Sequence, residues 1–143
     1  MALIRRPERA RGAVLLDKDG TLLDDVPYNV DPARMRLAPG AARALRLLGR
    51  LGMPVAVVSN QPGVALGRFT ESALGVVHRR LADLFEQHGA TLAAFFYCPH
   101  HPDGVVPAYA CDCVCRKPRP GMLQRAAAIV ARVTARCHPE VCR

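Results

Sequence analysis

The strongest constraint on the fold is a short apolar run, residues 13–16, that leads directly into the acidic, glycine-containing segment 17–21. An uninterrupted apolar run of this length is typical of a parallel strand buried on both faces. Asp17 and Asp19, two residues apart at the end of such a strand, can point into one cavity, where they can bind a divalent cation or act as nucleophile and proton carrier. The spacing alone also fits an Asx turn with solvated acids.

Two further apolar runs, 54–58 and 92–97, alternate with helical patterns. Helices are predicted over 41–51, ending at Gly52, from 70 to about 88, ending at Gly89, and from 120 to about 135. This order predicts an α/β fold with an open, Rossmann-like parallel sheet, flanking helices, and ligands beyond the carboxyl ends of the strands. Since the chain has 143 residues and half of them are hydrophobic, we expect a single domain, 1–143.

The formal net charge of +8 comes mainly from arginines spread along the chain. Because they are not interleaved with stacking aromatic side chains, we expect a small anionic ligand and no nucleic-acid partner. The first residues lack the apolar stretch of a signal peptide, and no run approaches the ~18 apolar residues of a membrane span. We therefore expect a cytoplasmic protein without a membrane partner.

Six cysteines in a chain without a recognisable export signal favour metal binding over disulfides. Two closely spaced ligand pairs suit tetrahedral, structural Zn²⁺, namely Cys98 with His100 and Cys113 with Cys115. The spacing leaves alternatives open, because Cys111 precedes Cys113 at the same interval and His101 lies beside His100. A weaker candidate metal group near the end of the chain consists of Cys137, His138 and Cys142.

The Asp-x-Asp-Gly-Thr sequence at 17–21 resembles the first motif of the haloacid dehalogenase (HAD) phosphatases. Ser59, after the second apolar run, and Lys117, before the last helix, match the second and third motifs. Segments 59–71, 98–102 and 113–123 are similar to the heptose 1,7-bisphosphate phosphatase and histidinol-phosphatase family of that superfamily. The resemblance covers about residues 14–126.

The resemblance implies a Mg²⁺-dependent phosphomonoester hydrolase with a zinc-bearing loop. Asp17 would be the nucleophile that forms an aspartyl-phosphate, and Asp19 the general acid and then base. Ser59 and Lys117 would hold the transferring phosphoryl group. Mg²⁺ would be bound by Asp17 and the backbone carbonyl of Asp19. The substrate-binding residues that the family implies are Asn60, Gln61 and Arg116, and its register favours Cys113 and Cys115 as zinc ligands.

Two features depart from the family pattern. The family carries a fourth, acidic motif on a strand beside the first strand, whereas Glu140 is the only acid past Gln124 here. We therefore expect a C-terminally truncated chain whose first strand is a sheet edge capable of self-association, although the family is monomeric. Leu66 stands where the heptose enzymes usually have Arg. The expected function is D,D-heptose 1,7-bisphosphate 7-phosphatase; the alternatives are histidinol-phosphate phosphatase and a silent, zinc-binding remnant.

Overall fold

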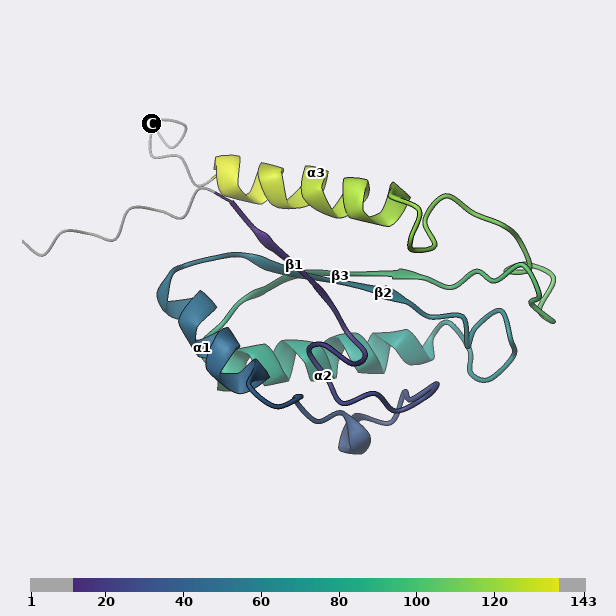
Figure 1. Ribbon diagram of the computed structural model, residues 1–143, viewed down its shortest axis with the longest axis horizontal. Coiled ribbons are helices and arrows are strands. Elements are labelled where there is room, and N and C mark those ends of the chain that lie inside the picture. The colour runs from purple at the N-terminus through teal and green to yellow at the C-terminus, as the bar shows by residue number, and fades with distance from the viewer. Residues whose placement is uncertain (1–11, 137–143) are drawn as a thin grey trace, which may run out of the picture.

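The fold is a three-stranded parallel sheet covered by helices on both faces (Figure 1). The computed structural model describes the backbone of residues 12–136 and the side chains as far as Arg132. The strands, in the spatial order β1-β2-β3, are β1 (Val14–Asp17), β2 (Val55–Asn60) and β3 (Leu92–Cys98). The helical elements are η1 (Pro32–Arg34), α1 (Ala41–Arg50), α2 (Ala73–Gln87) and α3 (Gly121–Arg136). The α/β fold class expected from the sequence is confirmed.

Successive strand residues face two separate cores. Leu16, Val57 and Phe95 pack in the larger core beneath α1 and α2, whereas Val58 and Phe96 face the smaller core beneath α3. Apolar side chains on both faces of a strand are what a parallel sheet between two helical layers requires. The sheet is therefore a rigid base, and the carboxyl ends of its three strands lie at one edge.

The observed boundaries differ slightly from the sequence-based ones. β1 begins one residue later than predicted and includes Asp17, and β2 extends through Asn60. The helix predicted from residue 70 begins at Ala73, because Thr70 and its neighbours form a turn in which the Thr70 carbonyl accepts the Ala73 N–H at 3.0 Å. Asp17 and Asn60 are thus strand residues, which fixes their backbones.

Within the described residues, β1 pairs with β2 alone and its other side is an open edge. An apolar groove of about 290 Å³ lies there, lined by residues of β1 and α3 such as Leu15 and Val130. Self-association through this edge stays a prediction. Residues 137–143, which hold the second candidate metal group and Glu140, lie outside the described part of the chain. No helix within residues 12–136 has the length and apolarity needed to cross a bilayer.

Candidate active site and metal centre

The predicted catalytic residues meet at the carboxyl edge of the sheet. Asp17 ends β1, and Ser59 is the penultimate residue of β2, so adjacent strands present them side by side. Asp19 stays beside them because the chain turns back at Gly20, whose φ of +73° is readily adopted only by glycine. The Leu23 N–H donates to the Lys18 carbonyl at 2.9 Å and closes this turn.

Lys117 reaches the same edge from the loop before α3. Its ammonium Nζ lies 2.7 Å from Asp17 Oδ1 and donates to the Val58 carbonyl at 3.1 Å. The Lys18 N–H also donates to Asp17 Oδ1, at 2.8 Å. Both contacts fall on Oδ1 and the Asp17 side chain is 46% exposed, so its Oδ2 is open to an incoming ligand.

Asp19 is held at both of its carboxylate oxygens. The ammonium of Lys18 lies 2.5 Å from Asp19 Oδ1, and the Lys18 side chain is only 3% exposed. Gln61 Nε2 donates to Asp19 Oδ2 at 3.3 Å and to Ser59 Oγ at 2.8 Å. The sequence-based set of site residues missed Lys18, although a lysine between two carboxylates directly after a buried strand is a signal for such a pair.

Asn60, predicted to bind substrate, contacts the backbone of Lys117. Its Nδ2 donates to the Lys117 carbonyl at 3.0 Å, and its Oδ1 accepts the Lys117 N–H at 2.9 Å. Next to Lys117, Arg116 lies near the same edge and donates from a guanidinium nitrogen to the His100 carbonyl at 3.5 Å. The end of β2 is thereby joined directly to the loop that carries Lys117 and Arg116.

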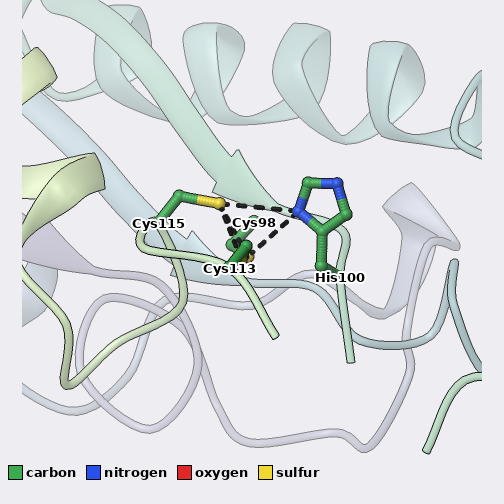
Figure 2. A group of neighbouring side chains, drawn as sticks. All are labelled: Cys98, His100, Cys113 and Cys115. Carbon is green, nitrogen blue, oxygen red and sulfur yellow. Dashed lines mark hydrogen bonds between the residues drawn. The ribbon is translucent and has the colours of Figure 1, made fainter. Parts of the chain in front are cut away.

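A second cluster lies where β3 passes into this loop. Figure 2 shows the side chains of Cys98, His100, Cys113 and Cys115 pointing toward one another. The three sulfur atoms are 3.0–3.3 Å apart, and His100 Nδ1 lies 3.5 Å from Cys115 Sγ and 3.7 Å from Cys98 Sγ. Cys111 is exposed and outside the cluster, and His101 Nδ1 instead accepts the Asp103 N–H.

The three thiols of the cluster differ in pKa, which is raised for Cys98 and Cys115 and lowered for Cys113. Burial raises the pKa of the Cys98 thiol, and its hydrogen bond with Cys115 adds to the effect. Burial also raises the pKa of Cys113, but hydrogen bonds involving Cys115, Cys98 and the backbone of Arg116 outweigh it and lower that pKa to about 6. Thiolate is the ligating form of cysteine, and ligand atoms all within 4.8 Å of one another fit a tetrahedral ion such as Zn²⁺.

A carboxylate that was not among the predicted site residues, that of Glu71, also holds the loop between β3 and α3 in place. Glu71, just before α2, accepts hydrogen bonds from Tyr97 Oη at 3.1 Å and from Tyr109 Oη at 2.6 Å. The hydrogen bond to Glu71 is the main cause that raises the pKa of Tyr109. The pKa of Tyr97 is raised mainly by burial and, to a smaller extent, by the Glu71 carboxylate. These residues border a pocket of about 490 Å³ beside His100. This contact could not be predicted from a local sequence pattern, because Tyr109 comes close to Glu71 only when the loop that carries Tyr109 folds back toward α2.

Comparisons with known proteins agree with this geometry. A D-glycero-beta-D-manno-heptose-1,7-bisphosphate 7-phosphatase from Rhodopseudomonas palustris is 39% identical over 79% of the chain and 63% of its own length. The crystal structure of a HAD-like phosphatase from Mesorhizobium loti matches 84% of the chain with a TM-score of 0.76 and 39% identity, and the chain covers 57% of it. Over about four fifths of its own length, the chain is therefore similar in sequence and in fold to HAD-like phosphatases. No family model matches it.

A second solved structure, the D,D-heptose 1,7-bisphosphate phosphatase from B. bronchiseptica complexed with magnesium and phosphate, is 31% identical to this chain. It matches 84% of the chain with a TM-score of 0.70, and the chain covers 64% of it. Three of the curated relatives are matched over 52–63% of their own length. The chain thus spans between half and two thirds of these relatives.

Proposed function

We propose that the protein is a Mg²⁺-dependent phosphomonoester hydrolase that removes the 7-phosphate of D,D-heptose 1,7-bisphosphate. The observation that carries the proposal is the convergence of Asp17, Asp19, Ser59 and Lys117 at one edge of the sheet. Relatives that share this fold are named for that reaction, and one was crystallised with magnesium and phosphate. The two carboxylates and two ammonium groups at the edge provide the charges that phosphoryl transfer needs.

The reaction begins with the open oxygen of Asp17. Asp17 Oδ2 attacks phosphorus, the bond from phosphorus to the sugar oxygen breaks, and Asp19 gives its proton to that oxygen. Asp19 then takes a proton from water, which attacks the aspartyl-phosphate, so that phosphate leaves and the Asp17 carboxylate is restored. Lys117 and Ser59 bind the phosphoryl oxygens throughout.

The hard oxygen donors at this edge suit Mg²⁺. The Asp17 carboxylate and the backbone carbonyl of Asp19 are the groups that would hold it. Bound there, Mg²⁺ would neutralise charge on the phosphoryl group. The cluster of Cys98, His100, Cys113 and Cys115 would hold a structural Zn²⁺ that fixes the loop of Arg116 and Lys117.

One observation favours a second substrate. Leu66, in the loop after Gln61, offers no cation to a distal phosphate, and this suits histidinol phosphate, which has a single phosphate. Arg116, next to Lys117 in the chain, would bind either substrate. Asn60, which we predicted to contact substrate, supports the site in this structure through the Lys117 backbone.

The test is Mg²⁺-dependent phosphate release from heptose 1,7-bisphosphate and from histidinol phosphate. The parent chain is compared with Asp17→Asn, and Asp83→Asn, an exposed aspartate on α2, is the matched control. We expect turnover by the parent and by Asp83→Asn and none by Asp17→Asn, with heptose bisphosphate the faster substrate. A folded parent chain that hydrolyses neither substrate contradicts the proposal. Faster turnover of histidinol phosphate reassigns the substrate.

A further inference from the structure

The general acid of the proposed reaction, Asp19, lies on a turn after β1, and the surrounding donors determine where its carboxylate points. Lys18 contacts Oδ1 and Gln61 donates to Oδ2. We propose that Gln61 is a positioning residue that holds the Asp19 carboxylate against the leaving oxygen, and that it does not bind substrate directly. This inference rests on the proposed function and deepens it.

Gln61 has no donor left for a substrate. Its residue is 5% exposed, and Nε2 uses its two N–H groups on Asp19 Oδ2, at 3.3 Å, and on Ser59 Oγ, at 2.8 Å. Its backbone is also fixed, because the Gln61 N–H donates to the Cys98 carbonyl at 2.8 Å. Gln61 therefore joins the ends of all three strands, since Asp19 follows β1, Ser59 is the penultimate residue of β2 and Cys98 ends β3.

Asp19 needs both contacts. Its side chain is 32% exposed and lies outside the strand, so the single contact to Lys18 leaves the plane of the carboxylate free to rotate about that oxygen. A general acid acts within about 2.6–3.2 Å of the leaving oxygen, and a misplacement of about 1 Å can cost about 10²-fold in rate. The bond from Gln61 to Oδ2 removes that rotation.

Substrates with different leaving groups can show whether Gln61 positions Asp19 or binds the substrate. In the first step an oxygen of Asp17 bonds to phosphorus, the ester P–O bond breaks, and the proton of the Asp19 carboxyl group passes to the departing oxygen. An alkoxide from a sugar or amino alcohol is a poor leaving group without that proton. The p-nitrophenolate anion leaves without it, so a misplaced Asp19 slows cleavage of the alkyl ester far more.

The experiment compares Gln61→Leu and Gln61→Glu with the parent. Gln61→Leu removes both bonds, whereas Gln61→Glu can accept a hydrogen bond from the Ser59 hydroxyl, with the native direction reversed, but places a carboxylate against Asp19. The substrates are p-nitrophenyl phosphate and the better alkyl substrate of the two proposed above. Gln87→Leu, at the exposed end of α2, is the matched control and should match the parent.

For both Gln61 variants we expect the rate of ester cleavage in the first turnover to fall about 10²-fold on the alkyl phosphate and much less on p-nitrophenyl phosphate, with little change in substrate affinity. First-turnover rates are compared because Asp19 also acts as base in the second step, which the two esters share. Equal losses of first-turnover rate on the two esters, or weaker substrate binding with an unchanged rate, overturn the proposal. Crystal structures of the parent and Gln61→Leu provide a readout independent of activity. Rotation of the Asp19 carboxylate in the variant supports the positioning role, and an unmoved carboxylate refutes it, even if the chain proves inactive and the proposed function fails.

Discussion

Replacing Asn60 with Ala should weaken both the fold and the site. The substitution removes two hydrogen bonds, of 3.0 and 2.9 Å, that join the end of β2 to the backbone of Lys117. At about 0.5–1.5 kcal/mol net for each, the free energy of unfolding should fall by about 1–3 kcal/mol. For a chain of this size that lowers Tm by roughly 4–12 °C. Thermal unfolding followed by circular dichroism measures it.

The same loss should reach catalysis, because Lys117 Nζ lies 2.7 Å from Asp17 Oδ1 and its backbone would lose its support. We expect kcat to fall about 10-fold to 10²-fold. Asn29→Ala is the matched control, since Asn29 also makes two bonds to one backbone, at 3.0 and 3.2 Å to Asp31, in an exposed turn. Its substitution should cost about 0.5 kcal/mol or less and spare activity. Similar losses of stability in the two variants would refute the reasoning.

Two further predictions concern the metal cluster and helix packing. Cys113→Ser should lose bound zinc in elemental analysis, and a chelator should lower Tm in the parent but not in this variant, because metal binding stabilises the folded loop. Cys111→Ser, outside the cluster, should keep its zinc, and equal zinc loss in both would contradict the assigned ligands. Gly49→Ala should destabilise the protein by about 1–3 kcal/mol, because a methyl group there overlaps the Gly89 carbonyl. The control is Gly75→Ala, which is also in a helix but has no close neighbour, and it should stabilise the protein by about 0.5–1 kcal/mol. Chemical denaturation measures both changes. If both substitutions stabilise the protein, α1 does not pack against Gly89 as described.

The strands, their order along the chain and the edge where Asp17 and Ser59 meet could be predicted from the sequence, since the signals are local. The run 13–16 is continuous because both faces of β1 meet a core, and Asp17 follows it directly. The two ligand pairs, Cys98 with His100 and Cys113 with Cys115, could likewise be recognised because the members of each pair are two residues apart. The fold brings all four side chains together.

The contacts that orient the proposed catalytic groups could not be predicted in this way. Gln61 follows Ser59 in a polar segment, and only the pairing of β1 with β2 brings its amide to Asp19. The contact between Asn60 and the Lys117 backbone joins residues far apart in the chain. Glu71 meets Tyr109 only because the loop returns toward α2. In each case the residue type shows that the side chain can form a hydrogen bond, but the tertiary fold determines which partner it bonds to.

The loop between β3 and α3 contributes little to either core, yet it must deliver Lys117 to Asp17 within hydrogen-bond distance. Polar contacts do this work at three separate places: the thiol and imidazole cluster at the end of β3, Asn60 at the end of β2, and Glu71 before α2. Each contact joins a residue at or beside a helix or strand to a residue of the loop. The rigid sheet and helices therefore fix the position of the loop and, with it, the position of Lys117. A metal ion bound in the cluster would restrain the same segment that the amide of Asn60 holds, and the two restraints would act independently. Loss of one should therefore reduce catalysis partially, and loss of both should reduce it by more than either variant alone.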